Sequence, residues 1–544
     1  MFIRMIFFAI ALKGIPSYAS GTSTGPIARL DSATVIGITG DSVTKFLGIP
    51  FAKPPARFRA SVAPDAYQGR LDATKYGALC PQQQLSAPDT GIPEITQIVN
   101  TTPELHNAPG VESEDCLTIN IIKPNVKDHS SHALPVLVWI HGGAYEIGDT
   151  ASYDDMGSDL VKRSVALGQP MIFVSFNYRL SAYGFLAGQE VFKDGNGNLG
   201  LRDQRLALKW VNKYIGAFGG DNSKVTIWGQ SSGAISVSLQ MITNGGNNEG
   251  LFRAGFLQSG SPLPVGNITK GTGQVYYDFL SADTGCSTSS DTLECMRALP
   301  FSVLKASVDK TPSFFSYQSL ALVWHPSVDG VFLTDNPQSS VQQGKFANIP
   351  FVSGVCDDEG TLFGISSLNV TTEDQFRQYI SSVWLPRNPA PELDQLWTFY
   401  PSDITLGSPF NTGTQNALTP QFKRASAFIG DSVQQGPRRA FLQKASTTQK
   451  VWSYLNQRSK STPGIGSYHG SDLATGLVND NLINFVNHLD PNTGHGVHWP
   501  NYDSHSPKLL TFPVTGPPLV TLDTFRATEI AYLTNLSLAH PFVL

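Results

Sequence analysis

Residues 225–241 read VTIWGQSSGAISVSLQM. The first four are β-branched or aromatic and favour a buried strand, while residues 234–241 can form a helix. The G-x-S-x-G stretch between them, residues 229–233, therefore falls on a tight strand-to-helix turn. A serine there needs small neighbours, and its Oγ stands at the positive end of the following helix. This context favours Ser231 as a nucleophile over an ordinary Gly/Ser turn.

Similar apolar runs recur along the chain, separated by helical stretches. They lie at residues 136–140, 171–176, 225–228, 351–355 and 451–455. The segment 201–215 carries apolar residues at approximately helical spacing, so the second run, this helix and the third run predict a βαβ unit with parallel strands. The pattern predicts an α/β fold with a large, mostly parallel central sheet and helices on both faces.

The composition excludes several classes of protein. Of 544 residues, 41% are hydrophobic and only 15% are charged, which rules out a wholly disordered chain. Lys and Arg number 38 against 43 Asp and Glu, a net charge of −5, and no basic run stands out, so nucleic-acid binding is not expected. The length allows several domains or one large α/β domain with long loops.

A serine nucleophile needs a base and an acid that orients the base, and on this kind of turn they follow in the order acid, histidine. Three adjacent carboxylates, Asp357, Asp358 and Glu359, follow the run 351–355, and position alone does not choose between them. Six histidines come later: His469, His488, His495, His498, His505 and His540. His469 lies in a Gly-rich loop soon after the run 451–455, which suits a catalytic loop.

Acyl transfer also needs N–H donors for an oxyanion. The sequence HGGAY at 141–145 follows the run 136–140, and its successive small residues leave backbone N–H groups uncovered. The N–H of Ser232, directly after the nucleophile, adds another donor. The alternative is a plain Gly-rich turn. Because the loop occurs together with the candidate nucleophile Ser231, this alternative is the weaker interpretation.

These motifs resemble the type-B carboxylesterase family, which includes cholinesterase-like enzymes and fungal lipases. Beyond residues 229–233, the resemblance is carried by EDCLTIN at 114–120, NLGLRDQ at 198–204, FGGD at 218–221, DEG at 358–360 and HGSD at 469–472. It spans about residue 27 to the C-terminus and implies the α/β-hydrolase fold. The stretch DITLGSPFNTG at 403–413 places the chain closest to the fungal lipase and sterol esterase branch.

The resemblance implies a role for each matching position. It implies a catalytic triad of Ser231, Glu359 and His469, and oxyanion donors at Gly143, Ala144 and Ser232. It implies no metal and no cofactor, and it pairs Arg57 with Glu114 in a structural ion pair. Two positions depart from the family: Ser232 stands where Ala is usual, and Ala144 where Gly is usual. Both keep their N–H, so we expect the donors to remain while the local shape changes.

The cysteines fit the same resemblance. Pairing near neighbours among the five gives Cys80–Cys116 and Cys286–Cys295 and leaves Cys356 free, and the resemblance supports this choice. In the fungal branch the first disulfide bounds a mobile lid, which here corresponds to residues 81–115. Five apolar residues could form its inner side, namely Ile92, Ile95, Ile98, Val99 and Leu105. The alternative is a fixed loop in which these residues are simply packed.

The N-terminus predicts secretion. Residues 1–19 read MFIRMIFFAIALKGIPSYA, with a basic start, a short apolar core and small residues at the cleavage site, which is typical of a signal peptide. The remainder, residues 20–544, is then one catalytic domain. Four N-x-S/T sequons, at Asn100, Asn267, Asn369 and Asn535, are candidate glycosylation sites.

The sequence thus predicts a secreted, extracellular serine carboxylic-ester hydrolase that acts on apolar esters. Its partners would be a small-molecule or lipid ester and, transiently, a lipid surface, with the protein a monomer or a weak homodimer. An esterase for short-chain or phenolic (feruloyl-type) esters stays open as the alternative. A non-catalytic cholinesterase-like binding protein is a remote one, since every position of the triad is filled.

Overall fold

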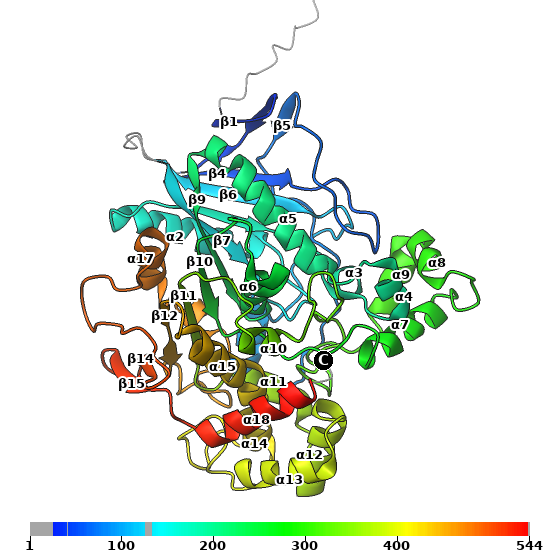
Figure 1. Cartoon of the computed structure of the whole chain (residues 1–544), viewed down its shortest axis with the longest axis vertical. Helices are drawn as coiled ribbons and strands as arrows, with labels where there is room; N and C mark the ends of the chain where they lie inside the picture. The colour runs from blue at the N-terminus through cyan, green and yellow to red at the C-terminus, as the bar shows by residue number, and fades with distance from the viewer. Residues whose placement is uncertain (1–24, 41, 126–132, 542–544) are drawn as a thin grey trace, which may run out of the picture.

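The computed structural model describes residues 25–40, 42–125 and 133–541. The predicted signal peptide, residues 1–19, lies outside these residues. In the described ranges, two sheets form the framework (Figure 1). The smaller one joins three strands in the order β1-β2-β5, namely β1 (Ile27–Leu30), β2 (Ala33–Ile36) and β5 (Arg70–Asp72).

Within the described residues, the larger sheet has twelve strands, in the order β15-β14-β13-β11-β10-β9-β7-β8-β6-β4-β3, with β12 paired to β11. The strands from β8 to β14 run parallel, and antiparallel strands flank them on both sides. Their bounds are β3 (Ile38–Thr39), β4 (Val43–Pro50), β6 (Thr118–Pro124), β7 (Leu134–Ile140), β8 (Ile172–Phe176), β9 (Gly220–Gln230), β10 (Ala254–Gln258), β11 (Phe351–Cys356), β12 (Val451–Trp452), β13 (Tyr454–Asn456), β14 (Lys508–Phe512) and β15 (Leu519–Leu522).

Helices cover both faces of this sheet (Figure 1). On one face lie α2 (Asp154–Ala166) and α17 (Asn479–His488), and on the other α5 (Leu199–Tyr214), α6 (Ser232–Ile242) and α15 (Gly436–Ala445). Alternate side chains of one strand serve the two faces: Trp139 packs with the first group of helices, and Val138 with the second. Burial on both faces explains why the strands read as unbroken apolar runs.

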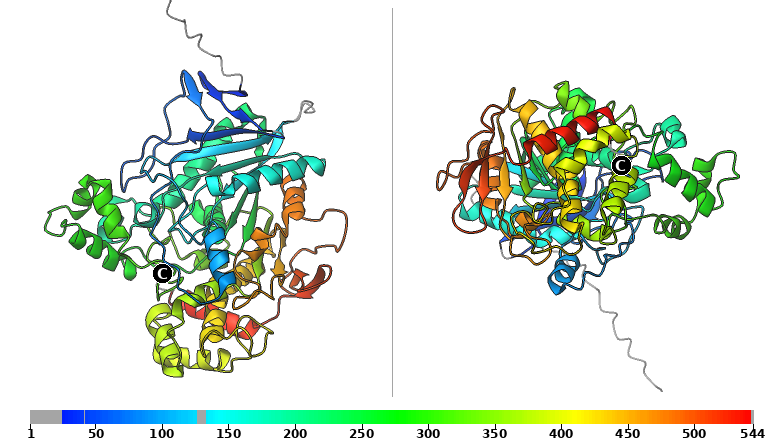
Figure 2. Two further views of the ribbon diagram at one scale, coloured as in Figure 1. Left: turned by 180° about the vertical axis from the view of Figure 1, so that it is seen from behind. Right: turned by 90° about the horizontal axis from the view of Figure 1, so that it is seen from below.

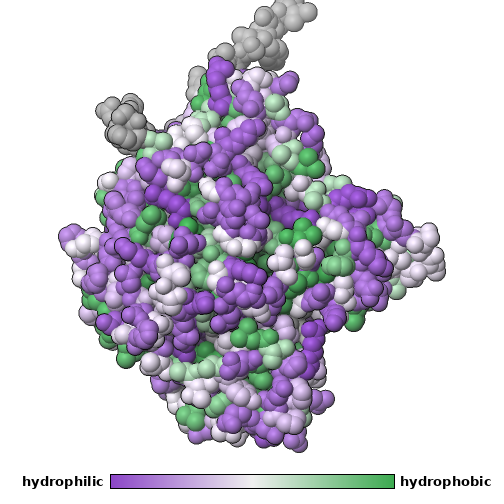
Figure 3. Space-filling view, viewed as in Figure 1, coloured by the Kyte–Doolittle hydropathy of each residue, from purple (hydrophilic) through white to green (hydrophobic). Residues whose placement is uncertain are grey.

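The remaining helices lie around this core, several of them at its lower end in Figure 1. They are α1 (Pro93–Thr101), α3 (Ser181–Phe185), α4 (Gln189–Asp194), α7 (Thr272–Asp283), α8 (Thr292–Ala298), α9 (Phe301–Val308), α10 (Pro337–Gln342), α11 (Thr361–Gly364), α12 (Glu373–Tyr379), α13 (Ala390–Phe399), α14 (Phe422–Gly430), α16 (Ser471–Ala474) and α18 (Ala527–Ala539). No helix in the described part of the chain is both long and apolar enough to span a bilayer. On the face drawn in Figure 3, hydrophilic side chains predominate and hydrophobic ones are scattered.

The predicted runs correspond to β7, β8, β9, β11 and the pair β12 and β13. The structure refines three details. The run 451–455 is broken at Ser453 into β12 and β13, and both strands pair with β11. Strands β8 and β9 are parallel as predicted, but β7 lies between them. Finally, β10 (AGFLQ) was not predicted, because it carries no β-branched residue.

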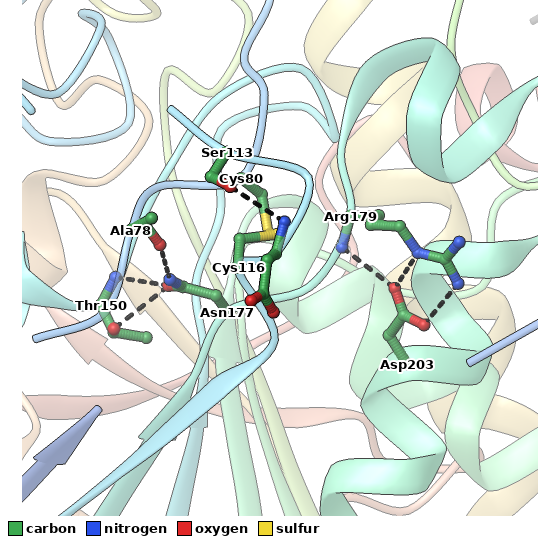
Figure 4. Close-up of a disulfide and its surroundings, with 9 residues drawn as sticks. Ala78, Cys80, Ser113, Cys116, Thr150, Asn177, Arg179 and Asp203 are labelled. Carbon is green, nitrogen blue, oxygen red and sulfur yellow. Dashed lines mark hydrogen bonds and ion pairs between the residues drawn. A yellow bond between two sulfur atoms is a disulfide. The ribbon is translucent and has the colours of Figure 1, made fainter. Parts of the chain in front are cut away.

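The structure contains the disulfides Cys80–Cys116 and Cys286–Cys295, and Cys356 is a free, buried thiol. Figure 4 shows the first disulfide close to the buried ion pair of Arg179 and Asp203, whose guanidinium and carboxylate make two hydrogen bonds of 2.7 Å. The predicted ion pair of Arg57 and Glu114 is also present, with Nε to Oε1 at 2.8 Å.

A second buried cluster ties the last strand to α15. Asp523 follows β15 and accepts hydrogen bonds from Arg438 at 2.9 Å, Arg439 at 2.7 Å and the Tyr502 hydroxyl at 3.1 Å. Burial alone would raise the pKa of Asp523, but the two guanidinium groups outweigh it and lower the pKa well below the usual range. The stabilisation is therefore complete above about pH 4 and is lost as pH falls toward the lower pKa of the folded state.

We expect Asp523→Asn to lower the free energy of unfolding by about 3–5 kcal/mol at pH 7, because two buried arginines lose their counter-charge. Urea denaturation measures this loss. It should stay constant between pH 7 and pH 5 and shrink below about pH 4. Asp65→Asn, which removes an exposed pair with Lys53, is the control and should cost less than about 1 kcal/mol. Equal effects of the two variants would contradict this account.

Candidate active site

Ser231 lies between the end of β9 and the start of α6, as the sequence predicts. Its backbone is in a sparsely populated region, with φ 57° and ψ −130°, and is held by hydrogen bonds from its N–H to the Gln258 carbonyl and from the Ile235 N–H to its own carbonyl. The turn depends on Gly229 and Gly233. A Cβ on Gly229 would lie 2.4 Å from Gly233, and one on Gly233 would lie 2.0 Å from the Ile140 oxygen. Ser231 itself stays partly exposed.

The loop after β7 lies against this turn. A Cβ on Gly142 would come within 3.1 Å of the Ser231 Cβ. The next two residues turn the chain with positive φ, 101° at Gly143 and 55° at Ala144. Among the described residues, none accepts a hydrogen bond from the N–H of Gly143, Ala144 or Ser232. Three backbone donors are thus uncommitted beside Ser231.

Ser232 also contributes its side chain. The Ser232 Oγ accepts a hydrogen bond from the N–H of Tyr145 at 3.3 Å. The hydroxyl therefore links the turn at β9 to the loop after β7, a contact that an alanine could not make. This is a physical consequence of the departure from the family pattern at this position.

The structure separates the three adjacent carboxylates after β11. The Oε2 of Glu359 lies 2.5 Å from the Nδ1 of His469, and its Oε1 accepts the Cys356 N–H at 2.7 Å. Asp357 and Asp358 instead both bind the Nζ of Lys460 at 2.6 Å. Only Glu359 among the three faces the histidine.

Asp358 joins the two loops that carry Glu359 and His469. Its Oδ2 accepts the Ser467 N–H at 2.8 Å, and its Oδ1 accepts the Phe410 N–H at 2.9 Å. Burial and the neighbouring Asp357 raise the pKa of Asp358 to about 6, and Lys460 opposes that shift. This carboxylate positions the loops rather than the reacting groups.

His469 is the one candidate histidine that the fold buries. Its ring lies edge-on to Phe363, with 5.0 Å between the ring centroids, and is only 4% exposed. The other five candidates after Glu359 are exposed or half-buried, and in the described part of the chain none of them contacts Glu359. The structure thus brings His469 and Glu359 together and leaves the other five histidines apart.

Sequence reasoning missed Gln230, the residue before Ser231. Among the described residues no hydrogen bond joins Ser231 to His469; instead the Nε2 of Gln230 lies 3.2 Å from the Nε2 of His469. The motif G-x-S-x-G treats this position as variable, so its pattern carries no signal for the contact. Only the side-chain geometry reveals it.

A groove of about 530 Å³ opens beside the histidine loop. Tyr468 and Gly470, on either side of His469, line it together with Ile98 of α1 and the first turns of α2. Glu104 lies in its wall, and its carboxylate accepts the Tyr153 hydroxyl at 2.5 Å. Burial raises the pKa of Glu104, so this part of the wall carries less negative charge than a free glutamate would.

A serine on a strand-to-helix turn, a buried histidine–carboxylate pair and an adjoining loop with free N–H groups are the features of a serine hydrolase site. The sequence comparison agrees with this class. The chain belongs to the carboxylesterase family, whose sequence profile matches residues 24–517.

Similar proteins come from fungi. "Secreted lipase 1" of Botryotinia fuckeliana is 40% identical over 528 residues, covering 92% of this chain and 91% of the relative. "Secreted triacylglycerol lipase LIP1" of Gibberella zeae is 37% identical over 529 residues, covering 92% of this chain and 89% of the relative. The crystal structure of Aspergillus niger EstA matches with a TM-score of 0.79 and 26% identity, over 96% of this chain and 99% of that one. The predicted α/β-hydrolase fold is confirmed.

Proposed function

We propose that Ser231, His469 and Glu359 form a catalytic triad that hydrolyses carboxylic esters through an acyl-enzyme. The observation that carries this proposal is the contact between the His469 Nδ1 and the Glu359 Oε2, made at the same sheet edge as the strained turn of Ser231. The acceptor at Nδ1 fixes the proton there and leaves Nε2 as the base. The free N–H groups of Gly143, Ala144 and Ser232 supply the oxyanion donors.

The chemistry then proceeds in two halves. The Ser231 Oγ attacks the ester carbonyl while His469 takes its proton, and the three N–H groups stabilise the oxyanion. The C–O bond to the alcohol breaks, the alcohol leaves with the proton from His469, and the acyl group stays on Ser231. Water repeats the sequence and frees the acid. Glu359 stabilises the imidazolium in both halves.

We assign a lipase-like substrate range, with an apolar acyl chain on the ester. The names of the fungal relatives support it, and the groove beside the His469 loop leaves room for a substrate. The segment 81–115, held by the first disulfide, is the proposed lid, and its helix α1 is the blue helix near the centre of the left view of Figure 2. Ile92 and Ile95 pack beside Gly464, so opening the lid exposes apolar side chains to a lipid surface.

The substrate range is tested by a hydrolysis profile across acyl lengths, sterol esters and feruloyl esters. We expect preference for long acyl chains, with the rate rising when the ester passes its solubility limit and forms an emulsion. A flat response at that limit, together with preference for acetyl or feruloyl esters, would contradict the lipase-like range and favour the alternative esterase.

Secretion and glycosylation belong to the same proposal. The similarity to secreted fungal lipases supports an extracellular enzyme. All four sequon asparagines, Asn100, Asn267, Asn369 and Asn535, are exposed, so each is accessible to a glycan. We further propose that residues 20–544 act as one catalytic domain, as a monomer or a weak homodimer with transient contact to a lipid interface.

A further inference from the structure

The hydrogen bonds of His469 form a chain with defined directions. The Nε2 of Gln230 is an amide nitrogen, which can only donate, so the His469 Nε2 at 3.2 Å must accept. The proton of a neutral ring then sits on Nδ1 and is donated to the Glu359 Oε2. Glu359 is held in turn by the Cys356 N–H. In the free protein, Gln230 therefore donates a hydrogen bond to the Nε2 of His469, the same nitrogen that must take the proton of Ser231.

The Gln230 side chain is confined to this place. A Cβ on Gly142 would lie 3.0 Å from its Oε1, and a Cβ on Gly470 would lie 3.4 Å from its Nε2. The first of these distances is tighter than an ordinary contact and the second is not, so it is Gly142 whose small size makes room for the amide. Its Oε1 is buried and has no hydrogen-bond partner among the described residues. A buried carbonyl oxygen without a hydrogen-bond partner lowers the stability of the fold. A role for the Gln230 amide at the His469 ring gives a reason for this residue to be present.

We propose that Gln230 is a positioning residue for acyl transfer: its amide holds the neutral imidazole of His469 as the Nδ1–H tautomer until the Ser231 hydroxyl replaces it as the donor at Nε2. The proposal rests on the triad function above. No atom is transferred to or from Gln230. The amide only donates a hydrogen bond, which stabilises the base form of the ring, and it gives way when the hydroxyl of Ser231 approaches.

The charges around the ring make this role measurable. In the described part of the chain, the carboxylates near His469 are Glu359 from the turn after β11, Glu104 from the segment after α1, and Asp472 from α16. Tyr468, with its hydroxyl, adjoins His469 in the chain, and the Cys356 thiol lies against Asp472. Asp472 is itself bound by Gln258 and by the Tyr454 hydroxyl. Gln230 is the neutral contact at Nε2. Removing the amide donor of Gln230 destabilises the neutral form of the His469 ring. A carboxylate at the same place stabilises the imidazolium.

The test compares the wild-type enzyme with Gln230→Met, which keeps the shape without a donor, and Gln230→Glu, which adds a charge. Hydrolysis of a soluble p-nitrophenyl butyrate monomer is followed from pH 4 to pH 9, since the acid limb of kcat/KM reports protonation of the free enzyme's base. We expect the midpoint of this limb to rise in the order wild type, Gln230→Met, Gln230→Glu. Gln230→Glu should move it by about one pH unit or more, a tenfold loss on the acid side relative to its own plateau.

A merely structural role would lower kcat in both variants and leave the midpoint where it is, and coincident midpoints would overturn the proposal. The low-field proton NMR signal of the His469 Nδ1–H, titrated in the resting enzymes, should show the same order and does not depend on turnover. If Gln230→Glu does not fold, Gln230→Met decides the matter by its own shift. Failure here is distinct from failure of the triad, because the triad is judged by Ser231→Ala.

Discussion

Ser231→Ala should lower kcat for ester hydrolysis by about 10⁶-fold while leaving the fold unchanged. The large effect is expected because the acyl-enzyme cannot form without the Oγ, and removal of the nucleophile in such triads costs about as much as removal of the whole triad. A small residual rate over water would remain from the N–H groups and substrate binding. The measurement is single-ester kinetics on a folded variant, with circular dichroism as the check on folding.

A control comes from the helix that follows Ser231. Ser238 is a buried serine of α6, and among the described residues its hydroxyl donates only to the Ile235 carbonyl. Ser238→Ala should keep activity within a few-fold of the wild type. Retained hydrolysis in a folded Ser231→Ala variant would show that another residue carries the chemistry.

Glu359→Gln should be the next most damaging change, with kcat lowered by about 10⁴-fold. The amide that replaces the carboxylate can donate to Nδ1, which places the ring proton on Nε2 and removes the base that faces Ser231. That proton would also oppose the donor of Gln230 at the same nitrogen. Kinetics on a soluble ester measure the loss.

The neighbouring carboxylate provides the control for this prediction. Asp357 lies two residues away and binds Lys460 rather than the histidine. Asp357→Asn should therefore keep activity within about tenfold of the wild type. Comparable losses in the two variants would mean that the turn after β11 acts through its fold alone and that Glu359 has no special part.

Much of the fold follows from simple patterns in the chain. Strands buried on both faces show themselves as unbroken apolar runs, which is why β7, β8 and β11 are predictable. β10 is not predictable in this way because Ala254 and Gly255 weaken its strand pattern. Its parallel pairing with β9 and β11 stabilises it in the folded sheet. The order of the strands in the sheet also cannot be predicted from the sequence. No pattern in residues 171–228 indicates that β7 lies between β8 and β9.

The site divides in the same way. Ser231 and the loop at 141–145 are recognisable because their chemistry needs small residues at fixed offsets. The choice of Glu359 from three adjacent carboxylates depends on where each side chain points, and position in the chain does not determine that. Lys460, about a hundred residues away, forms ion pairs with Asp357 and Asp358. Gln230 contacts His469 from a position at which the motif allows any residue. Such contacts follow from tertiary packing.

The decisive measurement is intact-protein mass spectrometry after reaction with a p-nitrophenyl alkylphosphonate, which traps an activated serine by losing nitrophenolate. We predict one phosphonyl group on the wild-type enzyme, located by peptide mapping at Ser231, and none on Ser231→Ala. Glu359→Gln should take up the same group at Ser231, but far more slowly. Labelling at any other residue, or no labelling of an enzyme that hydrolyses esters, would contradict the assignment of Ser231 as the nucleophile.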